Sequence, residues 1–296
     1  MKTILVPTDF SPAAEAATEV AATIALKQQA EVVLLHVVEV PASGAFNVEG
    51  EVLTTDNWEE KIFSMKVIEN AKQKLERLTA ELTQRGVNTT HLLRLGSPFN
   101  GIREIITSET VDLVVMGTAG HSKLEEMIIG SNTEKVVRHA KCPVLTVHQA
   151  PLKTDFKNIV YATNLGAEDE AFARVVINTR EMYNGTIHLV RINTPSNFES
   201  DLKVKKEMEA FAKKANLTEY TINTFNHYNE EEGIIHFAKN IDADLIALST
   251  HGRTGLAHVL AGSIAEDLAN HSVIPVLTYV TTKSRNEKRI NQTRIP

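Results

Sequence analysis

Cysteine is almost absent from this sequence, because Cys142 is the single one among 296 residues. One cysteine excludes a disulfide within the chain and a cysteine-based metal cluster. The neighbouring residues Ala140, Pro143 and Val144 are apolar. They indicate a buried structural thiol, with a redox role as the alternative.

Long hydrophobic runs are also missing. No apolar stretch approaches the roughly 18–20 residues that a membrane span requires. The apolar stretch that follows Met1 is too short for a signal peptide. These absences predict a cytoplasmic protein without a membrane partner.

An excess of positive charge is lacking as well. The net charge of −6 argues against a large nucleic-acid-binding surface, so no nucleic acid is expected as a partner. No group of His, Cys, Asp and Glu has the spacing of a metal site. The Gly-x4-Gly-Lys-Ser/Thr phosphate loop is not found either. We therefore expect no metal site built by the protein itself and no phosphate loop of that type.

What the sequence does contain is a regular alternation of short apolar runs with helical patterns. This alternation is typical of a parallel α/β sheet with right-handed crossovers. The segment 39–58 has no clear period and predicts a long loop, either a binding segment or a tolerated insertion. In the first half, strands are expected at 3–6, 31–38, 89–95, 113–116 and 143–148, and helices from Pro12 onward and over 58–84, 99–109 and 131–140.

The same pattern restarts after residue 157. A tandem repeat of this kind predicts two domains, 1–148 and 158–281, joined by a linker over 149–157. The basic tail 282–296 shows no apolar period, and we expect it to be disordered. The expected strands of the second half are 158–163, 186–192, 219–225, 244–249 and 274–280.

A glycine pattern follows the fourth strand of each half. In the first half, Gly117-Thr118-Ala119-Gly120 is followed after nine residues by Gly130-Ser131; in the second, Ser249-Thr250-His251-Gly252 is followed after nine by Gly262-Ser263. Glycines at the end of a strand let the backbone approach a ligand closely. The start of the next helix offers unpaired N–H groups that favour phosphate. The pattern therefore predicts a phosphate-binding edge of the sheet.

Both halves resemble the universal stress protein domain. The resemblance rests on the opening Val6-Pro7-Thr8-Asp9-Phe10-Ser11, the second strand ending at His36-Val37-Val38, and the glycine pattern at 117–131. It implies two doubly wound five-stranded parallel sheets of strand order 3-2-1-4-5, each a Rossmann-like nucleotide-binding domain. It also implies ATP as a ligand. Mg²⁺ is expected only as an ion that comes with ATP, held mainly by phosphate oxygens. The fifth strands of two such domains typically pair, here within one chain, and a homodimer is a further prediction.

The family's nucleotide-binding residues match positions in the first half. Asp9 matches the acidic residue that meets the ribose or adenine end, Pro7 and Thr8 line the adenine side, and Val38 closes it. The resemblance places the phosphates at the glycines and at the helix start: Gly117, Gly120, Gly130, Ser131, Asn132 and Thr133. His121 follows the glycine loop directly, and we expect it to contact phosphate or solvent as a polar residue.

The second half departs from this pattern. Asn164 stands where Asp9 stands, Ala162 where Pro7 stands, and Ser249 where Gly117 stands. An amide hydrogen-bonds a ribose hydroxyl without charge assistance, and Ser249 adds a side chain where the backbone needs room. Nucleotide binding and a turn needed only for folding both remain open for the second half. Its remaining candidate residues are Gly252, Gly262 and Ser263.

Three functions are compatible with these residues. The first is an ATP-binding regulatory protein of the stress response, in which nucleotide occupancy changes what partners see. The second is a slow ATP hydrolase that uses His121, although the sequence places no nucleophile and partner base near it. The third is a scaffold that binds no nucleotide. We expect a binding protein rather than an enzyme, and we assign no catalytic residue.

Overall fold

The computed structural model describes residues 1–39, 58–118, 130–148, 154–251 and 261–281. It divides the chain into two compact units. One unit is Met1–Val136 with Val144–Pro151, and the other is Val137–Pro143 with Leu152–Pro296. The predicted loop at 39–58, most of the predicted linker and the predicted disordered tail lie outside the described residues, so those predictions remain untested.

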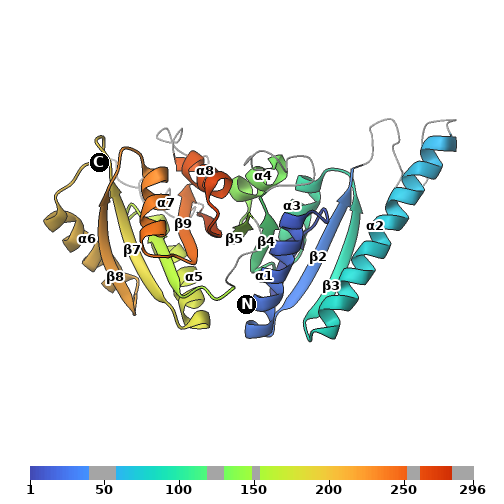
Figure 1. Cartoon of the computed structure of the whole chain (residues 1–296), viewed down its shortest axis with the longest axis horizontal. Coiled ribbons are helices and arrows are strands. Elements are labelled where there is room, and N and C mark those ends of the chain that lie inside the picture. The colour runs from blue at the N-terminus through green and yellow to red at the C-terminus, as the bar shows by residue number, and fades with distance from the viewer. Residues whose placement is uncertain (40–57, 119–129, 149–153, 252–260, 282–296) are drawn as a thin grey trace, which may run out of the picture. The chain divides into compact units, whose positions relative to one another are not determined.

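The first unit is a five-stranded parallel sheet with helices packed against it (Figure 1). The strand order is β3-β2-β1-β4-β5, which confirms the predicted order 3-2-1-4-5. Its elements are β1 (Thr3–Pro7), α1 (Pro12–Gln28), β2 (Glu31–Val38), α2 (Trp58–Gln84), β3 (Asn88–Leu95), α3 (Pro98–Ser108), β4 (Leu113–Gly117), α4 (Ser131–His139) and β5 (Val144–Val147).

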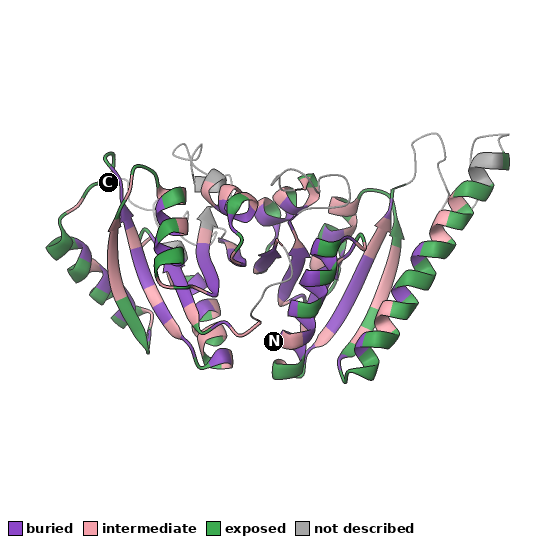
Figure 2. Cartoon of the chain, viewed as in Figure 1, coloured by how far each residue is buried: buried purple, intermediate pink, exposed green. Residues whose placement is uncertain are grey.

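Register and burial explain why these residues form this sheet. Thr3 pairs with Glu31 of β2, and Ile4 pairs with Leu113 of β4, so β1 lies in the middle. The inner residues of β1, β2 and β4 are buried, as expected for parallel strands that are covered on both faces (Figure 2). The carboxyl ends of β1, β2 and β4 therefore meet at one edge of the sheet.

Helix α1 illustrates how local sequence positions that edge. Ser11 is its N-cap, and the Ser11 hydroxyl accepts a hydrogen bond from the Ala14 N–H at 3.3 Å. Pro12 occupies the first helical position, where its missing N–H costs nothing. Small buried side chains such as Ala17 and Ala21 let α1 pack closely on the sheet. The first turn of α1 is thereby fixed at the end of β1.

The second unit repeats the architecture with the order β8-β7-β6-β9-β10, again with every pairing parallel. This order is the same 3-2-1-4-5 arrangement read from its own first strand. Its elements are β6 (Asn158–Ala162), α5 (Ala167–Tyr183), β7 (Thr186–Asn193), α6 (Asp201–Lys214), β8 (Tyr220–Asn226), α7 (Glu230–Asn240), β9 (Leu245–His251), α8 (Ala261–His271) and β10 (Val276–Thr281).

One further expectation has a structural outcome. Cys142 is buried, as predicted. Within the described residues, no helix combines the length and apolar character that a membrane crossing would require.

Candidate functional site

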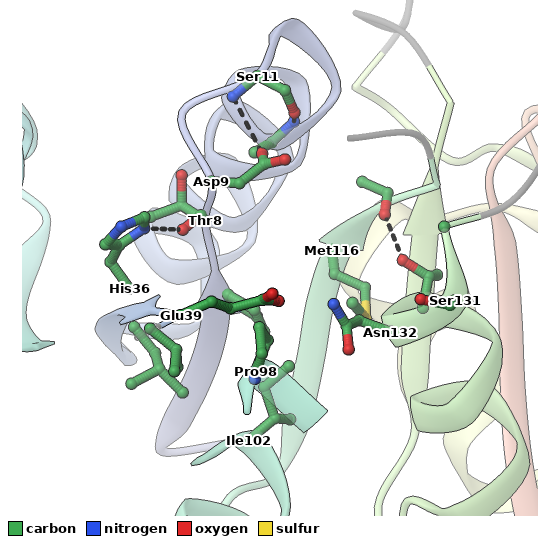
Figure 3. A pocket seen from close by; sticks show the side chains of 17 residues that line it. Thr8, Asp9, Ser11, His36, Glu39, Pro98, Ile102, Met116, Ser131 and Asn132 are labelled. Atoms are coloured by element: carbon green, nitrogen blue, oxygen red, sulfur yellow. Dashed lines mark hydrogen bonds between the residues drawn. The ribbon is translucent and has the colours of Figure 1, made fainter. Parts of the chain in front are cut away.

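A cavity of about 400 Å³ opens at the carboxyl ends of β1, β2 and β4 in the first unit (Figure 3). Two predicted groups of residues come together in its wall. The first group lies at the end of β1, and the second lies at the end of β4 and the start of α4. These residues are Pro7, Thr8, Asp9, Gly117, Gly130, Ser131, Asn132 and Thr133.

The turn after β1 holds Asp9 on this wall. The Thr8 N–H donates to the Leu35 carbonyl at 2.8 Å, and the Thr8 hydroxyl accepts from the Phe10 N–H at 3.0 Å. Phe10 has a φ of 62°, a left-handed conformation that the turn requires. One oxygen of the Asp9 carboxylate accepts from the Ser11 N–H at 3.0 Å (Figure 3). Asp9 is thus anchored by backbone before any ligand arrives.

His36 at the end of β2 faces the same cavity, and its ring orientation is fixed. Its Nδ1 lies 2.7 Å from the Thr8 carbonyl oxygen (Figure 3). A carbonyl only accepts, so Nδ1 carries the proton and donates it. The Phe10 ring lies 4.6 Å from the imidazole, centroid to centroid. In the neutral ring, Nε2 is then the atom that accepts hydrogen bonds.

The opposite wall is built by the start of α4. Gly117 ends β4, and its carbonyl accepts from the buried Thr133 hydroxyl at 2.8 Å. The Gly130 N–H donates to the Thr118 carbonyl at 2.7 Å, and the Gly130 carbonyl accepts from the Glu134 N–H at 3.1 Å. These bonds tie the first turn of α4 to the end of β4. N–H groups in a first helical turn have no partner within the helix, so this turn suits an anion.

Gly117 is required by packing as well as by its place in the cavity wall. A Cβ at Gly117 would lie 2.7 Å from the carbonyl carbon of Ala13 in α1. The absence of a side chain therefore lets α1 approach the end of β4. At Gly130, in contrast, the nearest atom to an added Cβ is the Thr118 carbonyl oxygen at 3.5 Å, which is ordinary contact.

The remaining predicted residues are not among the described residues that line this cavity. Val38 is buried and does not line the cavity, whereas its neighbours Val37 and Glu39 do. Gly262 and Ser263 fall in the first turn of α8. Gly120, His121 and Gly252 lie outside the described residues.

The sequence analysis missed several residues of the cavity wall. The Glu39 side chain points into the cavity toward Met116 and Asn132 (Figure 3). Pro98 and Ile102 of α3 complete the apolar side. Pro98 comes soon after β3. Its position at the carboxyl edge of the sheet could have identified it as a residue of the cavity wall. Glu39 directly follows β2, so the same signal was available for it.

The charges around the cavity are negative. Its described lining has the carboxylates of Asp9 and Glu39 and contains no Lys or Arg. Among the described residues, no group of three or more His, Cys, Asp or Glu has the arrangement of a metal site. Among the described residues of the cavity wall, an anionic ligand would meet backbone N–H groups and hydroxyls.

The second unit has a smaller pocket at the same edge, of about 90 Å³. The turn after β6 repeats the turn after β1: the Thr163 hydroxyl accepts from the Leu165 N–H at 2.8 Å, and Leu165 has a φ of 62°. Asn164 and Ser249 line this pocket. The second unit therefore keeps the backbone turn after its first strand, while its pocket is smaller.

Comparisons with known sequences give the same family for both halves of the chain. A model described as the universal stress protein family matches residues 1–148 and 155–279. A universal stress protein of Methanocaldococcus jannaschii is 34% identical over 153 residues, which cover 49% of this chain and 94% of that protein. A universal stress protein of Bacillus subtilis is 31% identical over 150 residues, with coverages of 49% and 97%. Each of these relatives thus corresponds to about half of the chain.

Among solved structures, a universal stress protein from Archaeoglobus fulgidus matches with a TM-score of 0.72 and 19% identity. The match covers 94% of this chain and 98% of that one. A functionally unknown protein from Pseudomonas aeruginosa matches with a TM-score of 0.64 and 18% identity, covering 95% and 92%. At these identities the likeness concerns the fold.

Proposed function

Because this chain belongs to the universal stress protein family, we propose that its first unit binds an adenine nucleotide, ATP, and acts as a regulatory binding protein of the stress response. One observation carries the proposal. Asp9 and the first turn of α4 converge on a single cavity of about 400 Å³. Ligand pockets in proteins typically measure about 300–1,000 Å³, so this volume suits a nucleotide.

Each wall has chemistry for one part of the ligand. The Asp9 carboxylate accepts hydrogen bonds from ribose hydroxyls, as a charge-assisted acceptor. Pro7, Val37 and Ile102 offer apolar surface to the base. At the other side, the first turn of α4 presents N–H groups and the Ser131 hydroxyl to the phosphates. Mg²⁺ would be held mainly by phosphate oxygens, which agrees with the lack of a protein metal site among the described residues.

The two other functions are kept as alternatives. Hydrolysis needs a positioned base, and His36 is the histidine of the described cavity wall. Its Nδ1–H donates to the Thr8 carbonyl, which orients the ring and leaves Nε2 as the atom available to act as a base. Hydrolysis by His36 is therefore kept as an alternative for the experiment below. His121, the candidate from the sequence, lies outside the described residues. A scaffold without nucleotide would leave the cavity unexplained.

One experiment separates the three functions. The purified protein is denatured, and the released small molecules are identified by mass spectrometry. We expect intact ATP, together with saturable binding of labelled ATP to the stripped and refolded protein. ADP formed at a rate that depends on the protein would favour the hydrolase. No released nucleotide and no binding of labelled ATP would favour the scaffold.

Asp9→Asn tests the ribose contact. The amide keeps the size of the side chain but removes the charge that strengthens its hydrogen bonds, and we expect ATP affinity to fall about tenfold. Equilibrium dialysis with labelled ATP measures the change. Asp201→Asn is the control, because Asp201 is exposed at the start of α6 in the second unit. If Asp9→Asn and Asp201→Asn bind ATP with equal affinity, Asp9 does not contact the nucleotide.

Assembly and location remain predictions, the assembly from the family resemblance and the location from the lack of long hydrophobic runs in the sequence. We propose that the fifth strands of two such domains pair, within the chain or between two chains, and that the protein works in the cytoplasm. In this proposal, nucleotide occupancy orders the edge of the first unit and changes the surface that a partner meets.

A further inference from the structure

The second unit carries a carboxylate where the first unit has a methyl group. Ala14, the third residue of α1, lines the cavity of the first unit. The third residue of α5 is Asp169, and it lines the smaller pocket of the second unit. Asp169 is 4% exposed. The same helix position therefore gives an apolar wall in one unit and a buried acid in the other.

Three hydrogen bonds hold the Asp169 carboxylate in place. The Thr163 hydroxyl donates to it at 2.5 Å, and the Gly166 N–H donates at 3.0 Å. The Ser249 hydroxyl at the end of β9 donates at 2.5 Å. The carboxylate thus links the turn after β6 to the end of β9. In the first unit, the residues at the positions of Asp169 and Ser249 are Ala14 and Gly117, and neither has a polar side chain.

Helix capping gives a local reason for this carboxylate. In the first unit, the Ser11 side chain caps α1. The N-cap of α5 is Gly166, which has no side chain to do so. Asp169 caps the helix instead, from the third helical position back to the Gly166 N–H. The change from serine to glycine at the cap therefore goes together with an acid directed into the pocket.

The opposite wall of the second pocket is also occupied by its own polar groups. Glu230 begins α7 at the position where Pro98 begins α3. The Asn197 amide donates to Glu230 at 2.7 Å. Burial raises the pKa of Glu230, while Arg191 and hydrogen bonds from Asn197 and Asn164 oppose that rise. Asn164, which stands in the place of Asp9, is thus engaged with Glu230.

We infer that the second pocket is filled by its own acid, and that Asp169 is the residue that excludes nucleotide from the second unit. The Asp169 carboxylate accepts the hydrogen bonds that a phosphate would accept at this place. Its negative charge also stands where the charge of a phosphate would stand. The reduction from about 400 to about 90 Å³ agrees with this exclusion. The expected content of one nucleotide per chain rests on the proposed function of the first unit; the exclusion from the second unit does not.

Replacing the second-unit residues by their first-unit counterparts tests the inference. We expect Asp169→Ala with Ser249→Gly to add one ATP-binding site per chain, counted by equilibrium dialysis of the full chain with labelled ATP. Ser249→Gly alone is the matched control. It restores the glycine and leaves Asp169 in place, so its site count is expected to equal that of the wild type. A new site in Ser249→Gly alone would show that the glycine decides, and would overturn the role of Asp169.

Folding is controlled by a third variant, because Asp169→Ala removes the cap of α5. Adding Gly166→Ser copies the Ser11 cap, and circular dichroism with thermal melting verifies that this triple variant is folded. A folded triple variant without an additional site overturns the inference. Two sites per wild-type chain would also overturn it while supporting the proposed function. If the wild type has no ATP-binding site and the triple variant has one, the result contradicts the proposed function and supports the inference.

Discussion

Gly130→Asp is expected to weaken ATP binding by on the order of 100-fold or more while leaving the fold intact. Gly130 immediately precedes α4 and lines the cavity, so its new carboxylate would stand at the phosphate end. Two like charges about 4 Å apart repel by about 4 kcal/mol near a protein surface, before screening by salt. Since about 1.4 kcal/mol corresponds to a factor of ten, a partly screened repulsion still gives this loss. Equilibrium dialysis or titration calorimetry measures it.

The stability of Gly130→Asp should not fall, because aspartate is a favoured N-cap residue and an added Cβ has room at Gly130. The control is Gly130→Asn, which has the same shape, is also favoured at an N-cap and carries no charge. We expect its ATP affinity to fall much less than that of Gly130→Asp, because an asparagine cap competes for N–H groups of the first turn but brings no charge. If Gly130→Asp and Gly130→Asn bind ATP equally well, the phosphates do not lie at the start of α4.

Much of the fold could be predicted because local and long-range signals agree. The helix over 58–84 was predicted with the bounds that the structure has, since its apolar positions keep a helical period until Gly86. Gly86 has a φ of +85°, a conformation that ends a helix and that glycine adopts readily. The shared edge was also predictable, because the carboxyl ends of neighbouring parallel strands lie together.

The details of the cavity wall were harder to predict because β2 is buried over most of its length. The run Val32-Val33-Leu34-Leu35 shows no alternation of polar and apolar residues, since parallel strands are covered on both faces. Periodicity then tells that Val37 and Val38 face opposite sides, but it does not tell which side is the cavity. The structure places Val37 in the wall and buries Val38 away from it.

Asp169 was missed for a different physical reason. Taken alone, an acid at the third position of a helix reads as an ordinary cap. Its second role depends on Ser249, which lies 80 residues later in the chain and donates to the same carboxylate. Only the spatial pairing of β6 with β9 brings these two positions together. The substitution of Gly117 by Ser249 was visible in the sequence, but the group that Ser249 meets was not.

Gly117→Ala is expected to destabilise the first unit by about 1–3 kcal/mol, the usual cost of overpacking. The added Cβ would lie 2.7 Å from the carbonyl carbon of Ala13 and 2.9 Å from its oxygen. These are backbone atoms, so α1 must shift as a whole to relieve the contact. The first turn of α1 carries Ser11 and Ala14 of the cavity wall, and ATP affinity should therefore fall together with stability. Urea denaturation with and without ATP measures both effects.

The Gly130→Asn variant serves here as the steric control, because it also adds a Cβ at a glycine of the cavity wall. Its nearest neighbour would be the Thr118 carbonyl oxygen at 3.5 Å, so no packed element has to move. We expect its urea midpoint to equal or exceed that of the wild type, since asparagine caps a helix well. If Gly117→Ala unfolds at the same urea concentration as Gly130→Asn, close packing of α1 on β4 is not what requires glycine at the end of β4. In that case the requirement for glycine would have to come from the ligand, and the loss of ATP affinity would appear without a loss of stability.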